Sequence, residues 1–105
     1  MGSIPTRSIM RQKQIHWAGF KVQKSPVADD EMDGDCEFST GRIRVDTKLR
    51  GRKELETLIH EGLHGLDPDM SEDRVLNTGR QLAALLWRWG YRLPGPKVKE
   101  KSDGR

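Results

Sequence analysis

Two of the three histidines of this chain lie four residues apart in the run His60-Glu61-Gly62-Leu63-His64. Residues four apart on a helix lie one turn above one another, so both imidazoles can reach one metal ion while Glu61 stands beside them. This spacing is typical of zinc hydrolases, in which the glutamate handles the proton of a water molecule. It predicts a metal site if the flanking sequence supplies a helix and a third ligand.

A hydrolytic zinc site needs three protein ligands and one open position for water. We expect Glu72 to be the third ligand, because the apolar face of the next predicted helix extends back to it. A carboxylate on such a face needs a partner, and a metal ion would be one. Four rival ligands stay open: Asp67 and Asp69 on the connecting loop, Asp73 beside Glu72, and Cys36 earlier in the chain.

The histidine pair needs a helix, and the sequence predicts one over residues 51–65. Its apolar residues recur at helical spacing on one stripe, and both histidines lie well round from the centre of that stripe. One face is therefore expected to meet the core and another to carry the chemistry. Gly65 is the predicted C-cap. A second helix is expected from a cap at Asp69 or Ser71 to about Trp89, with Gly90 as its terminator.

Three segments before these helices have the alternation of strands. Residues 15–24 predict a strand with a break or bulge near Gly19. A short strand through Cys36 and Phe38, a turn over residues 39–41 and a strand over residues 42–46 predict a hairpin. We expect an α+β fold, with a small antiparallel sheet packed on two helices and the second helix returning across the first.

Length and composition limit the architecture to one small domain. The chain has 105 residues, of which 33% are charged, 33% hydrophobic and 6% aromatic. We expect the compact domain over residues 15–93, with a flexible basic arm over residues 1–14 and a disordered basic tail over residues 94–105. The single cysteine excludes an internal disulfide, and no apolar run is long enough for a signal peptide or a membrane span. These features predict a cytoplasmic protein without membrane contact.

With these motifs the chain resembles zincin-like metallopeptidases of the gluzincin type, and more narrowly the small H-E-x-x-H proteins encoded by phages and some bacteria. The resemblance covers residues 15–92. The similar segments are residues 34–36, 42–46, 49–51, 57–64, 71–75 and 86–92. The resemblance implies that His60, His64 and Glu72 bind Zn²⁺ and that Glu61 is the catalytic acid and base. It also implies that the strand over residues 42–46 is the sheet edge that aligns an extended peptide.

The expected function is therefore that of a zinc-dependent peptidase acting on a peptide or protein, in the host cytoplasm if the chain is phage-encoded. Tyr91, Arg44 and His16 are candidates for contacting the substrate or its oxyanion. One alternative is a nucleic-acid-associated or virion-assembly protein with a structural zinc. Another is an SprT-like protease acting on DNA-bound proteins, with the basic arms supplying DNA affinity. Glu61 argues against a structural zinc, because such a site needs no acid beside an open position.

Overall fold

The computed structural model describes residues 14–27 and 31–93 of the chain. The predicted arms lie outside these residues, apart from Gln14, which begins the first strand. The described elements are β1 (Gln14–Trp17), β2 (Phe20–Lys24), β3 (Gly34–Glu37), β4 (Arg42–Val45), α2 (Gly51–Leu66) and α3 (Glu72–Trp89). Neither of these two helices has the length and apolar composition that crossing a membrane requires.

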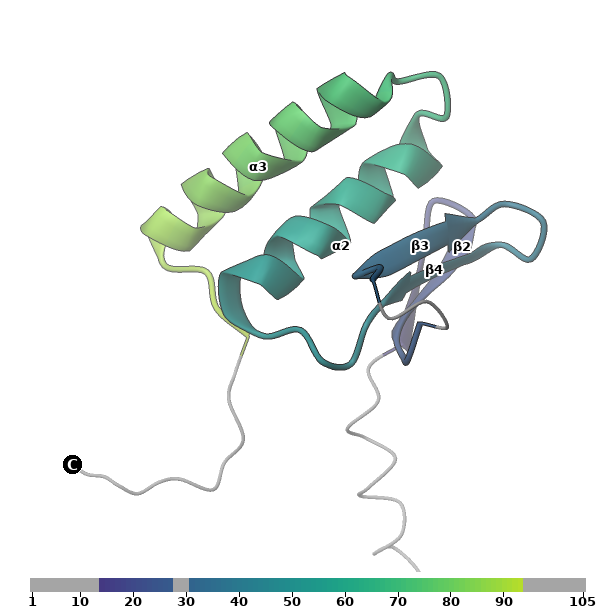
Figure 1. The fold of residues 1–105 in the computed structure, drawn as a ribbon, viewed down its shortest axis with the longest axis horizontal. Helices are drawn as coiled ribbons and strands as arrows, with labels where there is room; N and C mark the ends of the chain where they lie inside the picture. Colours follow the sequence, from purple (N-terminus) through teal and green to yellow (C-terminus); the bar gives the residue numbers. More distant parts are fainter. Residues whose placement is uncertain (1–13, 28–30, 94–105) are drawn as a thin grey trace, which may run out of the picture.

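The elements form an α+β fold in three layers, with the sheet, α2 and α3 stacked in that order (Figure 1). The predicted α+β arrangement of a small sheet and two helices is confirmed, and of the two helices it is α2 that packs closely on the sheet. The loop over residues 67–71 is short, so α3 returns antiparallel to α2. It lies on the side of α2 that faces away from the sheet (Figure 1). As a result α2 is covered by the sheet on one side and by α3 on the other.

The predicted strand over residues 15–24 is in fact a hairpin of β1 and β2. Its break is a two-residue turn at Ala18 and Gly19, closed by the pair Trp17 and Phe20. Both turn residues have positive φ, 54° and 84°. Two successive left-handed residues make the tight turn that matches strand twist and reverses the chain. The predicted break near Gly19 is therefore a reversal of the chain and not a bulge.

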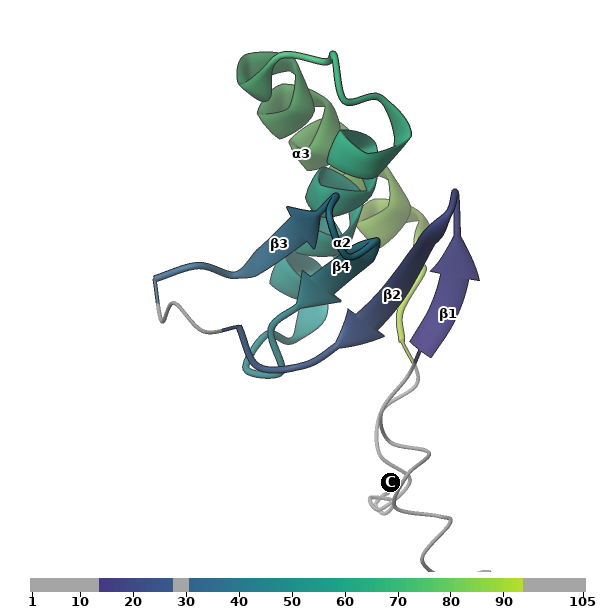
Figure 2. The ribbon, with the colours of Figure 1, turned by 90° about the vertical axis from the view of Figure 1, so that its right-hand side faces the viewer.

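The sheet is mixed, with the strand order β1-β2-β4-β3 (Figure 2), and not antiparallel as expected. The hairpin of β3 and β4 is confirmed, but β4 pairs with β2 in parallel. Although β4 follows β3 in the chain, it lies between β2 and β3 in the sheet. Strands that pair in parallel need a longer connection than a hairpin, and here that connection includes β3. The edge strand on this side is therefore β3, and the prediction that residues 42–46 form the edge is wrong.

The main core lies between the sheet and α2. Phe20, Val22 and Ile43 form its buried centre, against which Cys36 packs. Along β4, Ile43 and Val45 are buried, whereas Arg42 and Arg44 pair with acids on the opposite face of the sheet. This alternation is the one predicted for β4. Between the helices, Val75 and Ala83 of α3 are fully buried.

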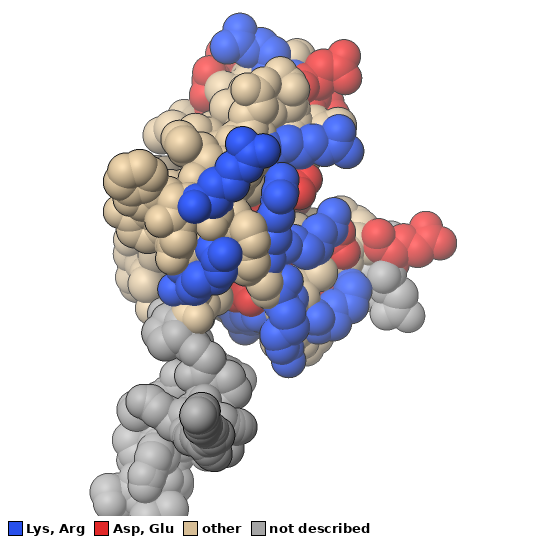
Figure 3. All heavy atoms as spheres, turned by 90° about the vertical axis from the view of Figure 1, so that its left-hand side faces the viewer, with Lys and Arg blue, Asp and Glu red and all other residues tan. Residues whose placement is uncertain are grey.

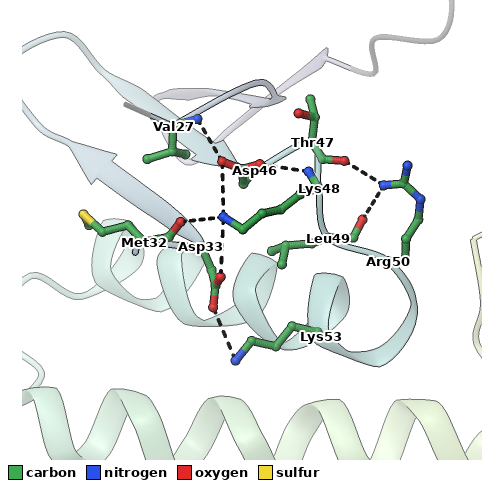
Figure 4. A network of polar contacts seen from close by, with 9 residues as sticks. All are labelled: Val27, Met32, Asp33, Asp46, Thr47, Lys48, Leu49, Arg50 and Lys53. Carbon is green, nitrogen blue, oxygen red and sulfur yellow. Dashed lines mark hydrogen bonds and ion pairs between the residues drawn. The ribbon is translucent and has the colours of Figure 1, made fainter. Parts of the chain in front are cut away.

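A polar network fixes the segment before β3 to the connection between β4 and α2 (Figure 4). The carboxylate of buried Asp46 accepts hydrogen bonds from the backbone N–H of Lys48 at 2.8 Å and of Val27 at 3.0 Å. These bonds lower the pKa of Asp46 below its ordinary value. Lys48 donates to the carbonyl of Met32, and Asp33 lies 3.4 Å from Nζ of Lys53 on α2. The network therefore holds the start of β3 against α2.

Both helices were predicted closely. α3 is capped by Ser71, whose hydroxyl accepts from the N–H of Arg74, and it ends at Gly90 in the left-handed conformation. α2 runs one residue beyond Gly65, and its C-cap is Asp67. The predicted cap at Gly65 is wrong because the helix can continue until Pro68, which does not favour further helix. The short loop to Ser71 then begins at once.

Candidate metal centre

Three candidate ligands converge where the two helices meet their connecting loop. Nε2 of His60 lies 3.3 Å from Oε2 of Glu72, and Nε2 of His64 lies 3.1 Å from Oε1 of the same carboxylate. The three ligand atoms all lie within 4.8 Å of one another. Within the described residues no other group of three histidine, cysteine or acidic side chains comes together in this way.

The spacing of these atoms fits a metal ion between them. Zinc holds nitrogen and oxygen ligands at about 2.0–2.2 Å, and two ligands at the tetrahedral angle are then about 3.3–3.5 Å apart. The two nitrogen–oxygen distances, 3.3 and 3.1 Å, are close to that edge length. Two imidazoles and one carboxylate are also a donor set of catalytic zinc sites, which leave one position open. The donor set therefore suits zinc, and the same two distances also fit ion pairs between Glu72 and protonated histidines.

The rival ligands lie elsewhere in the structure. Asp67 caps α2, and its carboxylate accepts from the N–H of Asp69 within the loop. Asp73 is exposed and outside the convergent group. Cys36 packs against the core, where burial, followed by the charges of Glu61 and Asp35, raises the pKa of its thiol. Glu72 is the acid that the fold brings to both histidines.

Glu72 reaches the histidines from an exposed position, and the expectation of a buried carboxylate is wrong. Its side chain is 68% exposed, whereas those of His60 and His64 are 19% and 25% exposed. Glu72 is the first residue of α3, so it lies at the rim of the helix pair and not between the helices. Burial is the main influence on His60 and lowers its pKa, which favours the neutral imidazole that binds metals.

Glu61 lies beside the ligands, between α2 and the edge strand. A Cβ placed on Gly34 of β3 would lie 3.3 Å from Cγ of Glu61 and only 2.6 Å from the carbonyl oxygen of Arg44. Burial is the largest influence on Glu61, followed by the negative charges of Asp35 and Glu72, and together they raise its pKa to about 7. Glu61 is therefore a shielded carboxyl group held by the close approach of β3.

An open cavity of about 260 Å³ leads away from His60 and Glu61 along α2. Met32 and Leu76 give it apolar walls, and Asp33, Lys53, Glu56 and Thr57 line the rest. None of these six lining residues was among the predicted site residues. The spacing held a signal for those on α2, because residues 53, 56, 57 and 60 follow the helical repeat of one face. Met32 and Asp33 gave no such signal.

The three predicted substrate contacts are not brought to the metal centre. Tyr91 follows the far end of α3, about 27 Å along the helix axis from Glu72. His16 lies on β1, the opposite edge of the sheet from β3. Arg44 extends from the outer face of β4 and is held by both oxygens of Asp35. These residues were predicted from the chemistry of their side chains alone, which does not show where the fold places them relative to the site.

The close approach at Gly34 predicts a pair of opposite mutational effects. Gly34→Ala places a methyl group against backbone and should lower the free energy of unfolding by about 1–3 kcal/mol. Gly62→Ala on α2 meets the Trp17 ring at an ordinary 3.6 Å and should be neutral or stabilising by up to about 1 kcal/mol. Urea unfolding of both variants measures the difference. Equal stability of the two would contradict the close approach of Gly34 to β4 and α2.

Searches of protein-family models, curated proteins and solved structures found no match to this chain. The site's own geometry is therefore the basis for assigning a function.

Proposed function

We propose that this protein is a zinc-dependent metallohydrolase, and specifically a peptidase. One observation supports the proposal: the donor atoms of His60, His64 and Glu72 lie within 4.8 Å of one another, while Glu61, the neighbour of His60, is not part of that group. A structural zinc site is normally closed by four protein ligands, whereas a hydrolytic one has three and an open position. The described residues supply three.

Each residue then has a defined role. His60, His64 and Glu72 would hold the ion, which supplies a Lewis acid that activates water near neutral pH and polarises a carbonyl oxygen. Glu61 would take the proton of the attacking water and deliver it to the leaving amine. The packing of β3 against Glu61 shields this carboxyl group from solvent. Because Glu61 follows His60 directly in α2, it stays close to the candidate ligands.

The surroundings of the centre support an extended peptide as the substrate. Among the described strands β3 pairs only with β4, so its other edge has backbone groups free for a further strand. A peptide added at that edge would pass beside Glu61. The adjoining cavity, with Met32 and Leu76 as apolar walls, is placed to receive a substrate side chain.

Metal analysis of the purified full chain tests the proposal. We expect one zinc per chain in the wild type. His64→Ala and Glu72→Ala should each lower zinc affinity by roughly tenfold or more, because losing a ligand should cost at least as much as losing a residue that only supports one. Asp73→Ala is the matched control, since it removes a neighbouring exposed carboxylate and should retain zinc. Loss of zinc in Asp73→Ala with retention in Glu72→Ala would show that the ligand assignment is wrong.

A further inference from the structure

The end of the molecule opposite the metal centre has a different chemical character. The described residues carry equal numbers of basic and acidic side chains, but the two kinds are segregated. Asp67, Asp69, Glu72 and Asp73 lie around the loop between the helices, whereas the end of α3 is basic and the start of α2 has Arg50 and Arg52 before Glu54, which pairs with Lys24. Figure 3 shows Lys and Arg side chains gathered on this face, with acidic side chains between some of them and at the margins.

Four exposed arginines of this end have no acidic partner among the described residues: Arg50, Arg52, Arg88 and Arg92. Most of the other exposed cations in the structure are paired, as Lys53 is with Asp33 and Arg80 with Glu56. Arg50 and Arg92 hydrogen-bond only to backbone carbonyls. The positive charge of these four side chains is therefore available to a partner.

Large aromatic side chains alternate with these arginines in the run Arg88-Trp89-Gly90-Tyr91-Arg92. The side chain of Trp89 is 78% exposed and that of Tyr91 is 60% exposed. A tryptophan this exposed contributes little to the fold and leaves a wide flat ring in water. The two rings therefore present stacking surfaces beside guanidinium groups that have no acidic partner among the described residues.

This surface is also held in shape. Gly90 and Tyr91 both donate backbone hydrogen bonds to the carbonyl of Leu86, which fixes the chain as it leaves α3. The guanidinium of Arg92 lies 3.5 Å over the ring of Trp87 and donates to the Trp87 carbonyl at 2.7 Å. A Cβ on Gly51 would lie 3.6 Å from the same indole, so the start of α2 adjoins this cluster. The arginines from both helices are thereby brought to one end.

We propose that Arg50, Arg52, Arg88 and Arg92, with Trp89 and Tyr91, form a binding surface for single-stranded nucleic acid. Phosphates neutralise unpaired arginines, and exposed aromatic rings stack with bases whatever the sequence. A duplex keeps its bases stacked inside and gives the rings little to contact. Phosphates and base rings are common to both nucleic acids, so single-stranded DNA and RNA should both bind. This binding does not depend on the metal centre.

Fluorescence anisotropy with the full chain tests the surface, using a labelled strand of about 20 thymidines or 20 uridines. We expect both strands to bind at about 50 mM salt and to bind more weakly at about 200 mM. Trp89→Ala/Tyr91→Ala should weaken binding roughly tenfold or more, because the loss of each ring removes a stacking contact with a base. Zinc content and the thermal midpoint should stay unchanged, since both side chains are exposed.

Two charge variants distinguish binding at this surface from attraction by the positive charge of the whole chain. Arg52→Gln/Arg88→Gln should make the negative slope of log K against log salt shallower by about 1.4, the value for two lost phosphate contacts. Lys21→Gln/Arg74→Gln removes the same charge from the sheet face and the other end of α3, and it should leave the slope close to that of the wild type.

Four results would overturn the proposal. The first is no binding by the wild type at about 50 mM salt. The second is equal weakening by both charge pairs with no effect of the aromatic variant, which would assign binding to net charge. The third is binding of a duplex of equal length as tight as that of the single strand. The fourth is a dimer lost in Trp89→Ala, by sedimentation, with oligonucleotide binding unchanged, which would make Trp89 a protein contact.

Discussion

Glu61→Gln is expected to lower peptide hydrolysis by roughly 10²–10⁴-fold, the usual contribution of a positioned general base. The amide keeps the size and polarity of the side chain but cannot accept the proton of the attacking water. Because Glu61 is not among the convergent ligands, zinc content and fold should persist. The measurement is cleavage of an unstructured protein or a broad peptide library by wild type and variant at equal zinc occupancy.

Glu56→Gln is the matched control for this experiment. Glu56 lies on the same helix and lines the same cavity, but it pairs with Arg80 at 3.6 Å and is four residues before His60. It should retain most of the activity. Equal zinc-dependent cleavage by wild type and Glu61→Gln would exclude the mechanism. No cleavage by either protein over the whole library would favour a structural role for the zinc.

Zinc is also expected to raise the stability of the folded chain strongly. An ion that binds only the folded state adds about 4 kcal/mol when its free concentration is 1,000 times the dissociation constant. For a domain of this size that corresponds to a rise of roughly 16 °C or more in the thermal midpoint. The ligands lie on two helices, so the ion would join the end of α2 to the start of α3. Thermal unfolding followed by circular dichroism, after chelation and again after zinc addition, measures the shift.

The variant His60→Ala/His64→Ala is the control for this stabilisation. It removes two of the three ligands, so added zinc should leave its thermal midpoint almost unchanged. Magnesium should stabilise neither protein, because it prefers six oxygen ligands and this site offers two nitrogens. A wild-type midpoint that does not respond to zinc, or an equal response in the double variant, would contradict a zinc site at these residues.

The parts of the site that were predictable are those set by local sequence. The helical repeat places His60 one turn from His64, and Ser71 and Gly90 mark the ends of α3. The loop between the helices is short, so it leaves few acids near the histidines, and Glu72 was the one on the expected face. Its exposure was not foreseen, because the sequence pattern does not show that the first turn of α3 lies at the rim of the helix pair.

The parts that were not predictable depend on contacts between distant segments. No local pattern shows that β4 lies between β2 and β3, because neighbouring strands in the sequence are usually neighbours in a sheet. The edge strand beside Glu61 was therefore misassigned. The approach of Gly34 to α2 follows from the same arrangement. Arg44 was a reasonable substrate contact by charge, but its face of the sheet and its partner Asp35 depend on the strand pairing.

The position of the candidate ligands within a single helical hairpin has a consequence for the order of folding. Residues 60–72 contain the three ligands and Glu61, and their contacts span few residues of the chain. Local contacts of this kind form early, with helices closing in about a microsecond. The parallel pair of β2 and β4 joins Lys21 to Arg42 and needs a longer loop to close. We therefore expect the helical hairpin, and with it the cluster of candidate ligands, to form before the sheet and its Gly34 edge are added.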